Sequence, residues 1–143
     1  MILYLDTSAL VKLYAREVGS AEVKRAVVRA DLVATSLVAY VEARSAFARK
    51  HRLADIDEAA LKRHKHEFEQ GWNRLDRLPV DATTIRRAGD LAEQYRLTAY
   101  DAVHLATADL MEVTLRSSVS FACFDDALNR AAASLGFTLI TDA

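Results

Sequence analysis

The chain has 143 residues, of which 52% are hydrophobic and 27% are charged, and its formal net charge is −1. These values are typical of a globular protein and exclude a disordered chain or one that binds polyanions over its whole surface. The length fits a single domain, residues 1–143. No apolar run approaches the roughly 20 residues that cross a bilayer. With one cysteine, Cys123, and no basic leader before Asp6, we expect a cytoplasmic protein without a disulfide or a membrane contact.

Short apolar runs alternate with helical patterns along the chain. We expect strands at 2–5, 32–35, 119–124 and 137–140, and an extended piece at 78–80 that contains the only proline. Helices are expected at about 9–14, 20–30, 36–53, 58–77, 81–95, 100–113 and 127–135, the last one stopped by Gly136. The expected caps include Ser20, Ser36 and Asp81, and capping boxes at Asp55–Glu58 and Thr98–Asp101.

This alternation predicts an α/β fold. Because the strands read as continuous apolar runs, the sheet should be mainly parallel and covered by helices on both faces, in three layers α/β/α. The segment 44–77 is predicted to form a helical excursion from this core. It carries nine Lys or Arg residues against six acids, which fits either a local surface for a phosphate backbone or a solvated face of mixed charge.

Four carboxylates are expected at one edge of this sheet. Asp6 and Asp125 each follow an apolar strand, and the carboxyl ends of parallel strands are where functional groups gather. Glu42 and Asp101 lie near the starts of helices that should begin at the same edge. A charge among the apolar neighbours of Glu42 is costly unless it is compensated, and clustered acids raise one another's pKa. A divalent cation resolves both conflicts, and oxygen ligands favour Mg²⁺, with Mn²⁺ as the second choice.

Each acid also has a simpler explanation. Asp6 fits as a cap of the first helix and Asp101 as the acid of a capping box. Asp125 and Asp126 fit as turn residues, and Glu42 fits as the partner of Arg44, Arg49 or another base. A shared site is favoured because four separate coincidences would otherwise have to meet at one edge. His104 follows Asp101 by three residues, on the same helical face. We expect it to pack or orient the helix rather than to bind metal.

Four segments resemble the motifs of a known family. Residues 2–10 (ILYLDTSAL) are similar to the opening motif of PIN-domain nucleases, most of all the VapC toxins of prokaryotic toxin–antitoxin pairs. Residues 36–42, 97–108 and 121–125 resemble the second, third and fourth motifs in the same order and spacing. The resemblance covers nearly the whole chain.

This resemblance implies a PIN-like fold and a metal-dependent endoribonuclease. Asp6 and Asp101 would be the principal metal ligands, with Glu42 and Asp125 completing the site directly or through water. The hydroxyls of Thr7 and Ser8 would orient a carboxylate or a bound water. Asp126 is an alternative to Asp125, because Cys123 stands where many members carry Thr or Ser. RNA, a cognate antitoxin and a second copy of the chain are the implied partners.

Other functions remain as alternatives. A PIN-like module that binds protein or RNA without catalysis is the main one, and the retention of all four acids counts against it. A structure-specific DNA nuclease is chemically allowed, but such relatives tend to be larger. A phosphotransfer domain is disfavoured by Ser8, where a phosphatase needs a second acid, and by the lack of a lysine before Pro79. The RNA target and the number of metal ions are not determined by the sequence.

Overall fold

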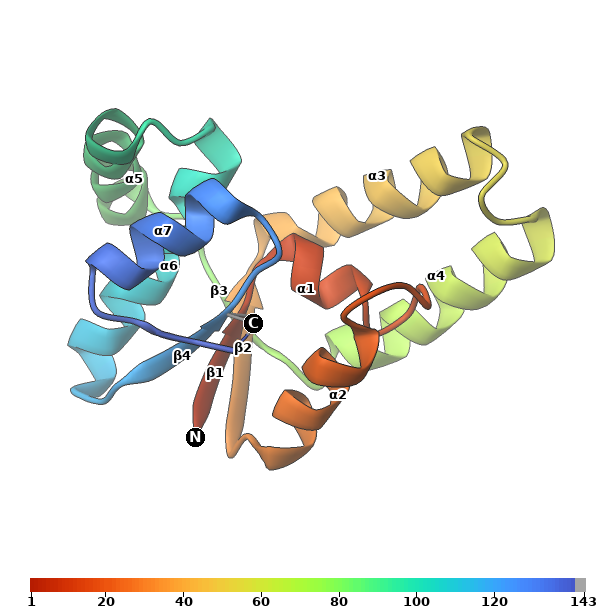
Figure 1. The fold of residues 1–143 in the computed structure, drawn as a ribbon, viewed down its shortest axis with the longest axis horizontal. Coiled ribbons are helices and arrows are strands. Elements are labelled where there is room, and N and C mark those ends of the chain that lie inside the picture. Colours follow the sequence, from red (N-terminus) through yellow and green to blue (C-terminus); the bar gives the residue numbers. More distant parts are fainter. Residues whose placement is uncertain (141–143) are drawn as a thin grey trace.

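The computed structural model describes residues 1–140, which form a parallel sheet with helices on both sides (Figure 1). The elements in chain order are β1 (Ile2–Leu5), α1 (Thr7–Val11), α2 (Ser20–Arg29), β2 (Leu32–Ser36), α3 (Val38–Arg52), α4 (Glu58–Trp72), β3 (Asp76–Leu78), α5 (Ala82–Tyr95), α6 (Ala99–Leu115), β4 (Val119–Ala122), α7 (Asp126–Ser134) and β5 (Thr138–Leu139). In the part of the chain that is described, no helix is long and apolar enough to cross a membrane.

The sheet has the strand order β3-β2-β1-β4-β5, and every neighbouring pair is parallel. The chain first builds outward from β1 to β2 and β3, and then crosses to the other side of β1 to form β4 and β5. The order therefore reverses between β1 and β4, and in open α/β sheets a crevice forms beyond the carboxyl ends of the strands at such a point. The residues that follow Leu5 and Ala122 therefore lie where such a crevice is expected.

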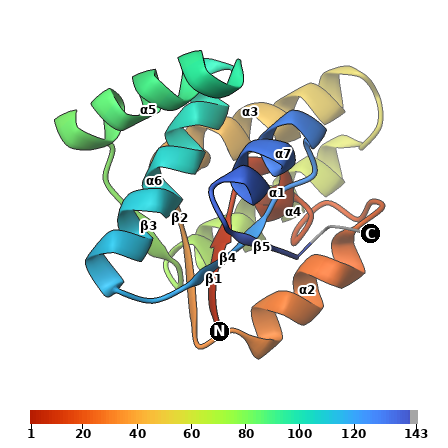
Figure 2. The same ribbon diagram turned by 60° about the vertical axis from the view of Figure 1, so that its left-hand side comes forward.

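Alternate residues of β1 bury into opposite layers. Leu3 and Leu5 join the core beneath α1, α2, α3 and α4, whereas Tyr4 joins the core beneath α5, α6 and α7. Figure 2 shows the two helical layers on either side of the strands. This is the period of two that a strand requires, and it explains why β1 is apolar throughout.

Helices α3 and α4 form the predicted excursion, an antiparallel hairpin that extends away from the sheet (Figure 1). Phe47 of α3 and Phe68 of α4 are fully buried, and Trp72 packs against Phe68 with ring centroids 5.6 Å apart. The aromatic residues of this segment therefore hold the hairpin together, as their helical spacing predicts.

The segment that follows Trp72 differs from the prediction. We expected α4 to continue to about Arg77, but it ends at Trp72, and Asp76–Leu78 pairs with β2 as an edge strand. The predicted cap is also displaced: Asp57, not Asp55, accepts the Ala60 N–H at 2.8 Å. Likewise α2 begins after Gly19 rather than on a capping Ser20 side chain. These errors lie at element ends, where several polar residues compete for one cap.

Gly19 is held in the left-handed region, with φ of 95°, and a Cβ at this position would lie 2.4 Å from Cε1 of Phe124. We expect Gly19→Ala to destabilise the protein by about 2–4 kcal/mol, because backbone strain adds to overpacking. Gly89 lies within α5 and has open space around it, so Gly89→Ala should stabilise by about 0.5–1 kcal/mol. Urea denaturation measures both changes. Equal stability of the two variants would contradict the packing described for Gly19.

Candidate metal centre

Asp6 lies directly at the reversal point of the sheet. Its backbone N–H continues the pairing of β1 with β4 by donating to the Ala122 carbonyl at 3.1 Å. Its side chain caps α1, because Oδ1 accepts the Ala9 N–H at 2.9 Å and the Ser8 hydroxyl at 2.7 Å. The residue is only 3% exposed. Asp6 is therefore both a helix cap and a buried carboxylate at the edge where a site was predicted.

Burial raises the pKa of Asp6, although the charge of His104 and the hydrogen bonds of Ser8, Ala9 and Cys123 act against that rise. A buried carboxylate with a raised pKa is one whose ionised form lacks sufficient compensation. A positive charge beside Asp6 would therefore stabilise the ionised state.

Asp125 reaches the same edge from β4. It caps α7 by accepting the Leu128 N–H on Oδ1 at 2.9 Å, and its own N–H donates to Sγ of Cys123 at 3.2 Å. Cys123 thus contacts the backbone of Asp125. It stands at the position where the family resemblance implies a Thr or Ser in many members. Asp126 is exposed and begins α7.

Asp101 is the third residue of α6 and is partly buried. Its pKa is raised first by burial and then by the charges of Asp125 and Asp6, while the Thr98 side chain and His104 lower it. Asp125 and Asp6 come from different strands, so their effect on Asp101 places three of the four predicted acids in one electrostatic neighbourhood. Among the neighbouring acids, the charge of Asp125 contributes most to this raised pKa.

Glu42, in the second turn of α3, is held differently. Its Oε1 accepts two hydrogen bonds, from Thr7 Oγ1 at 2.6 Å and from His104 Nε2 at 2.8 Å. Burial alone would raise the pKa of Glu42, but these bonds and the charge of His104 outweigh it and lower the pKa. Glu42 is thus bound to His104 rather than to Arg44 or Arg49, the arginine partners considered from the sequence.

His104 is packed in the core, as the sequence predicts, and it also contacts the predicted acid Glu42. It is 1% exposed, and its two ring nitrogens contact Tyr4 Oη at 2.7 Å and Glu42 Oε1 at 2.8 Å. The spacing of three from Asp101 placed it on the correct helical face. What the spacing did not reveal is its partners, which are 100 and 62 residues away in the sequence.

The donor set fits a hard divalent cation. Asp6, Asp101, Asp125 and Glu42 offer oxygen atoms only, the ligand type that Mg²⁺ and Mn²⁺ prefer. Between residues 1 and 140, no group of three or more Asp, Glu, His or Cys side chains is arranged so that it could hold a metal ion. Mg²⁺ does not need one, because it usually takes one or two protein carboxylates and keeps several waters. The raised pKa values of Asp6 and Asp101 point to the same need for a cation.

Lys12, near Asp6 in sequence, is engaged elsewhere. Its Nζ donates to Glu17 at 3.1 Å and lies 4.4 Å from the centroid of the Phe124 ring. Lys50 of α3 donates to the same carboxylate at 2.7 Å. These contacts connect the loop after α1 to α3 and to the segment that leads into Asp125. Lys12 therefore stabilises this region through Glu17 and Phe124 and does not line the site.

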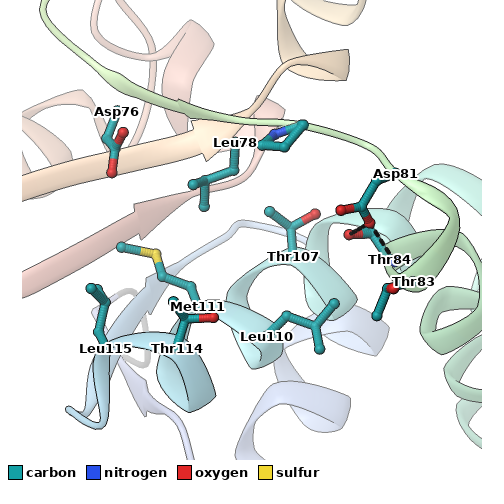
Figure 3. A pocket seen from close by; sticks show the side chains of 11 residues that line it. Asp76, Leu78, Asp81, Thr83, Thr84, Thr107, Leu110, Met111, Thr114 and Leu115 are labelled. Atoms are coloured by element: carbon teal, nitrogen blue, oxygen red, sulfur yellow. Dashed lines mark hydrogen bonds between the residues drawn. The ribbon is translucent and has the colours of Figure 1, made fainter.

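A cavity of about 460 Å³ lies away from the four acids, between the end of β3, the start of α5 and the second half of α6. Figure 3 shows the apolar side chains of Leu78, Leu110 and Met111 in the space between Asp76 and Asp81. None of the four predicted acids lines it. The chemistry predicted from the sequence therefore belongs to the sheet edge and not to this cavity.

Comparison with known proteins identifies close likenesses in sequence and fold. The sequence profile of the PIN domain matches residues 3–134. The chain is 36% identical over 107 residues to the ribonuclease VapC45 of Mycobacterium tuberculosis, covering 75% of this chain and 74% of that protein. It is 33% identical over 138 residues to the ribonuclease VapC46 of the same species, covering 96% and 95%.

Solved structures show the same architecture. A toxin–antitoxin complex from Klebsiella pneumoniae matches with a TM-score of 0.67 at 18% identity, covering 95% of this chain and 93% of that chain. VapBC2 from Rickettsia felis, bound to a DNA fragment from its promoter, matches with a TM-score of 0.66 at 14% identity and covers 97% of each chain. These likenesses confirm the predicted three-layer fold.

Proposed function

The chain belongs to the PIN-domain family, and from this premise we propose that it is a metal-dependent endoribonuclease and the toxin of a toxin–antitoxin pair. Two relatives at 36% and 33% identity are named ribonucleases, which supports RNA as the substrate class. The observation that carries the proposal is the placement of the acids: Asp6 and Asp125 follow the neighbouring parallel strands β1 and β4, and Asp101 lies in the first turn of α6. The raised pKa of Asp101, caused first by burial and then by the charges of Asp125 and Asp6, is consistent with this placement.

In this proposal Asp6 and Asp101 hold Mg²⁺ or Mn²⁺, and Glu42 and Asp125 complete the site directly or through water. A bound divalent cation lowers the pKa of water and stabilises negative charge on a phosphate. The protein's part is to hold its carboxylates still. Ser8 fixes one oxygen of Asp6 and Thr7 fixes one oxygen of Glu42, through bonds of 2.7 and 2.6 Å.

Hydrolysis then follows an inline course. The oxygen of a water forms a bond to the phosphorus as the bond to the 3′ oxygen breaks. The attacking water gives up a proton to a carboxylate or to solvent, and the departing 3′ oxygen takes up a proton from solvent, so the products are a 5′-phosphate and a 3′-hydroxyl. No general base other than the carboxylates is required.

The proposed partners are a cognate antitoxin and a second copy of the chain. The antitoxin is supported by two structural neighbours, a toxin–antitoxin complex and VapBC2. Leu37 and Val41 support the homodimer. They lie four residues apart at the start of α3 and are 48% and 60% exposed, so they offer one apolar face to a partner. We place the protein in the cytoplasm, where Cys123 stays reduced.

The test is cleavage of total bacterial RNA by the purified protein in Mg²⁺, in Mn²⁺ and in EDTA. We expect discrete fragments with 5′-phosphate ends in either cation and none in EDTA. Mass spectrometry of the same preparation establishes whether an antitoxin co-purified. Absence of cleavage by a preparation free of other proteins would contradict the proposal, as would cleavage that persists undiminished in EDTA.

A further inference from the structure

A chain of hydrogen bonds runs from the middle of the sheet to Glu42. Tyr4 of β1 contacts Nδ1 of His104 at 2.7 Å, and Nε2 of His104 contacts Glu42 Oε1 at 2.8 Å. Tyr4 is fully buried and His104 is 1% exposed. Strand β1, helix α6 and helix α3 are thus connected through one imidazole ring.

The roles of donor and acceptor follow from the chemistry of the groups. An ionised carboxylate only accepts hydrogen bonds, so Nε2 of His104 carries a proton that it donates to Glu42. The Thr7 hydroxyl donates its own proton to the same oxygen, and therefore its oxygen can only accept from Nε2, 3.1 Å away. Nδ1, on the other side of the ring, contacts the Tyr4 hydroxyl at 2.7 Å. Tyr4 therefore holds the ring in the orientation in which Nε2 faces Glu42.

The ring of Tyr4 is itself held rigidly. It stacks on Phe121 with a centroid separation of 5.6 Å and an interplanar angle of 5°, and it meets the His104 ring edge-on at 5.9 Å. The pKa of Tyr4 is raised well above the usual value by burial and by the charge of Asp6, so its hydroxyl stays protonated. Tyr4, at the end of the hydrogen-bond series opposite Glu42, is therefore held in place.

Both hydrogen bonds to Glu42 end on the same oxygen. Thr7 and His104 each donate to Oε1, and these are two donors from two different helices. Two such bonds fix the rotation of the carboxylate and leave Oε2 available for a ligand or a water. A glutamate on a helix otherwise has several rotatable bonds and would be a poorly placed ligand.

We propose that His104 is a positioning residue which, held by Tyr4, fixes the Glu42 carboxylate so that its second oxygen takes part in cation binding. This inference rests on the proposed function and adds to it. It gives His104 and Tyr4 a role that they exert through Glu42, without contacting the cation or the RNA themselves. A merely structural role for the two residues would affect stability alone.

The experiment compares His104→Leu, His104→Gln and Tyr4→Phe with the wild type by Mn²⁺ calorimetry, RNA cleavage and thermal unfolding. We expect His104→Leu to weaken Mn²⁺ binding and to lower kcat by about 10–100-fold, as losses of outer partners of ligands typically do. His104→Gln keeps an N–H at a similar reach and should recover most of both. Tyr4→Phe keeps the ring packing and should show a smaller loss in the same direction.

His64 supplies the matched control. It is another buried histidine, on α4, and its Nδ1 has no hydrogen-bond partner among residues 1–140. His64→Leu should therefore leave Mn²⁺ affinity and kcat unchanged. If His104→Leu is too unstable to assay, Tyr4→Phe decides: wild-type Mn²⁺ affinity and kcat in that variant would overturn the inference.

The outcomes separate this inference from the proposed function. A wild type that binds Mn²⁺ but cleaves no RNA contradicts the proposed function alone, and the affinities of the variants still decide the role of His104. A folded His104→Leu that binds Mn²⁺ and cleaves RNA like the wild type overturns the inference alone. A wild type that binds no Mn²⁺ overturns both.

Discussion

The Asp101→Asn variant is expected to lose RNA cleavage by at least about 100-fold while keeping its fold. Removing an outer partner of a metal ligand typically costs 10–100-fold, and removing a charged ligand should cost no less. Asp101 is partly buried in the field of Asp125 and Asp6, and asparagine has the same shape without the charge. Replacing it therefore relieves repulsion in the metal-free protein, so Tm should not fall. Initial rates on RNA in saturating Mg²⁺ measure the loss.

The matched control for this variant is Asp126→Asn. Asp126 is also an aspartate in the first turn of a helix at the same edge of the sheet, but it is exposed and is not among the charges that raise the pKa of Asp101. We expect it to cleave RNA within about twofold of the wild type, since exposed substitutions away from the site change little. Equal activity of Asp101→Asn and Asp126→Asn would remove Asp101 from the site.

Mg²⁺ is expected to raise the Tm of the wild type by roughly 8–10 °C when it is present at about 100 times its dissociation constant. Binding to the folded state alone contributes about 2.7 kcal/mol at that ratio, and each kcal/mol corresponds to about 3–4 °C for a domain of this size. The effect should be largest at neutral pH. At neutral pH Asp6 is ionised in the unfolded chain, whereas in the folded protein its raised pKa opposes ionisation.

The direction of the pH dependence follows from linkage. Burial raises the pKa of Asp6 in the folded state above the value of about 3.9 in the unfolded chain. Between the two values the folded state binds more protons, so the free energy of unfolding falls as the pH rises through this interval. Metal-free wild type should therefore lose stability relative to Asp6→Asn from about pH 4 upward, and Mg²⁺ should restore it.

Thermal unfolding in EDTA and in Mg²⁺, across pH 4–8, tests this prediction. Asp6→Asn keeps the Oδ1 acceptor that caps α1, so it should unfold at a Tm that responds little to pH in this range and little to Mg²⁺. A Tm of Asp6→Asn that rises with Mg²⁺ as much as that of the wild type would show that the cation binds elsewhere.

The fold class and the edge of the sheet could be predicted from local patterns. Four-residue apolar runs that bury on both faces, such as Ile2–Leu5, have no helical period and no polar side, so a covered parallel sheet is the only arrangement that satisfies them. Once the strands are parallel, the residues after Leu5 and after the predicted strand 119–124 must lie at the same edge. Parallel strands alone therefore predict that Asp6 and Asp125 lie at one edge of the sheet, before any side-chain contact is known.

The edge strand β3 could not be predicted in the same way. Asp76 and Arg77 are exposed and charged, and they read as the end of a polar helix. They form a strand only because β2 offers an unpaired edge, with Ala34 opposite Asp76 and Thr35 opposite Arg77. Tertiary pairing overrides local preference here, as it commonly does for short strands.

The partner of Glu42 was hidden for a related reason. The sequence showed that a charge at Glu42 needs compensation, and the nearest candidates were arginines on its own helix. The residue that meets it is His104 on α6, held by Tyr4 on β1. Contacts between residues 62 and 100 positions apart depend on how the layers pack, which a single sequence does not specify. The apolar neighbours of Glu42 indicate that its charge needs a partner, but they do not identify that partner.

The most direct test of the metal centre is a crystal structure of the protein grown with Mn²⁺, with anomalous scattering used to locate the ion. We predict an anomalous peak within about 2.5 Å of carboxylate oxygens of Asp6 and Asp101, with Glu42 or Asp125 contacting the ion directly or through water. A crystal saturated with Mn²⁺ that shows no peak among these carboxylates, from a protein that still cleaves RNA only when a divalent cation is present, would contradict this account.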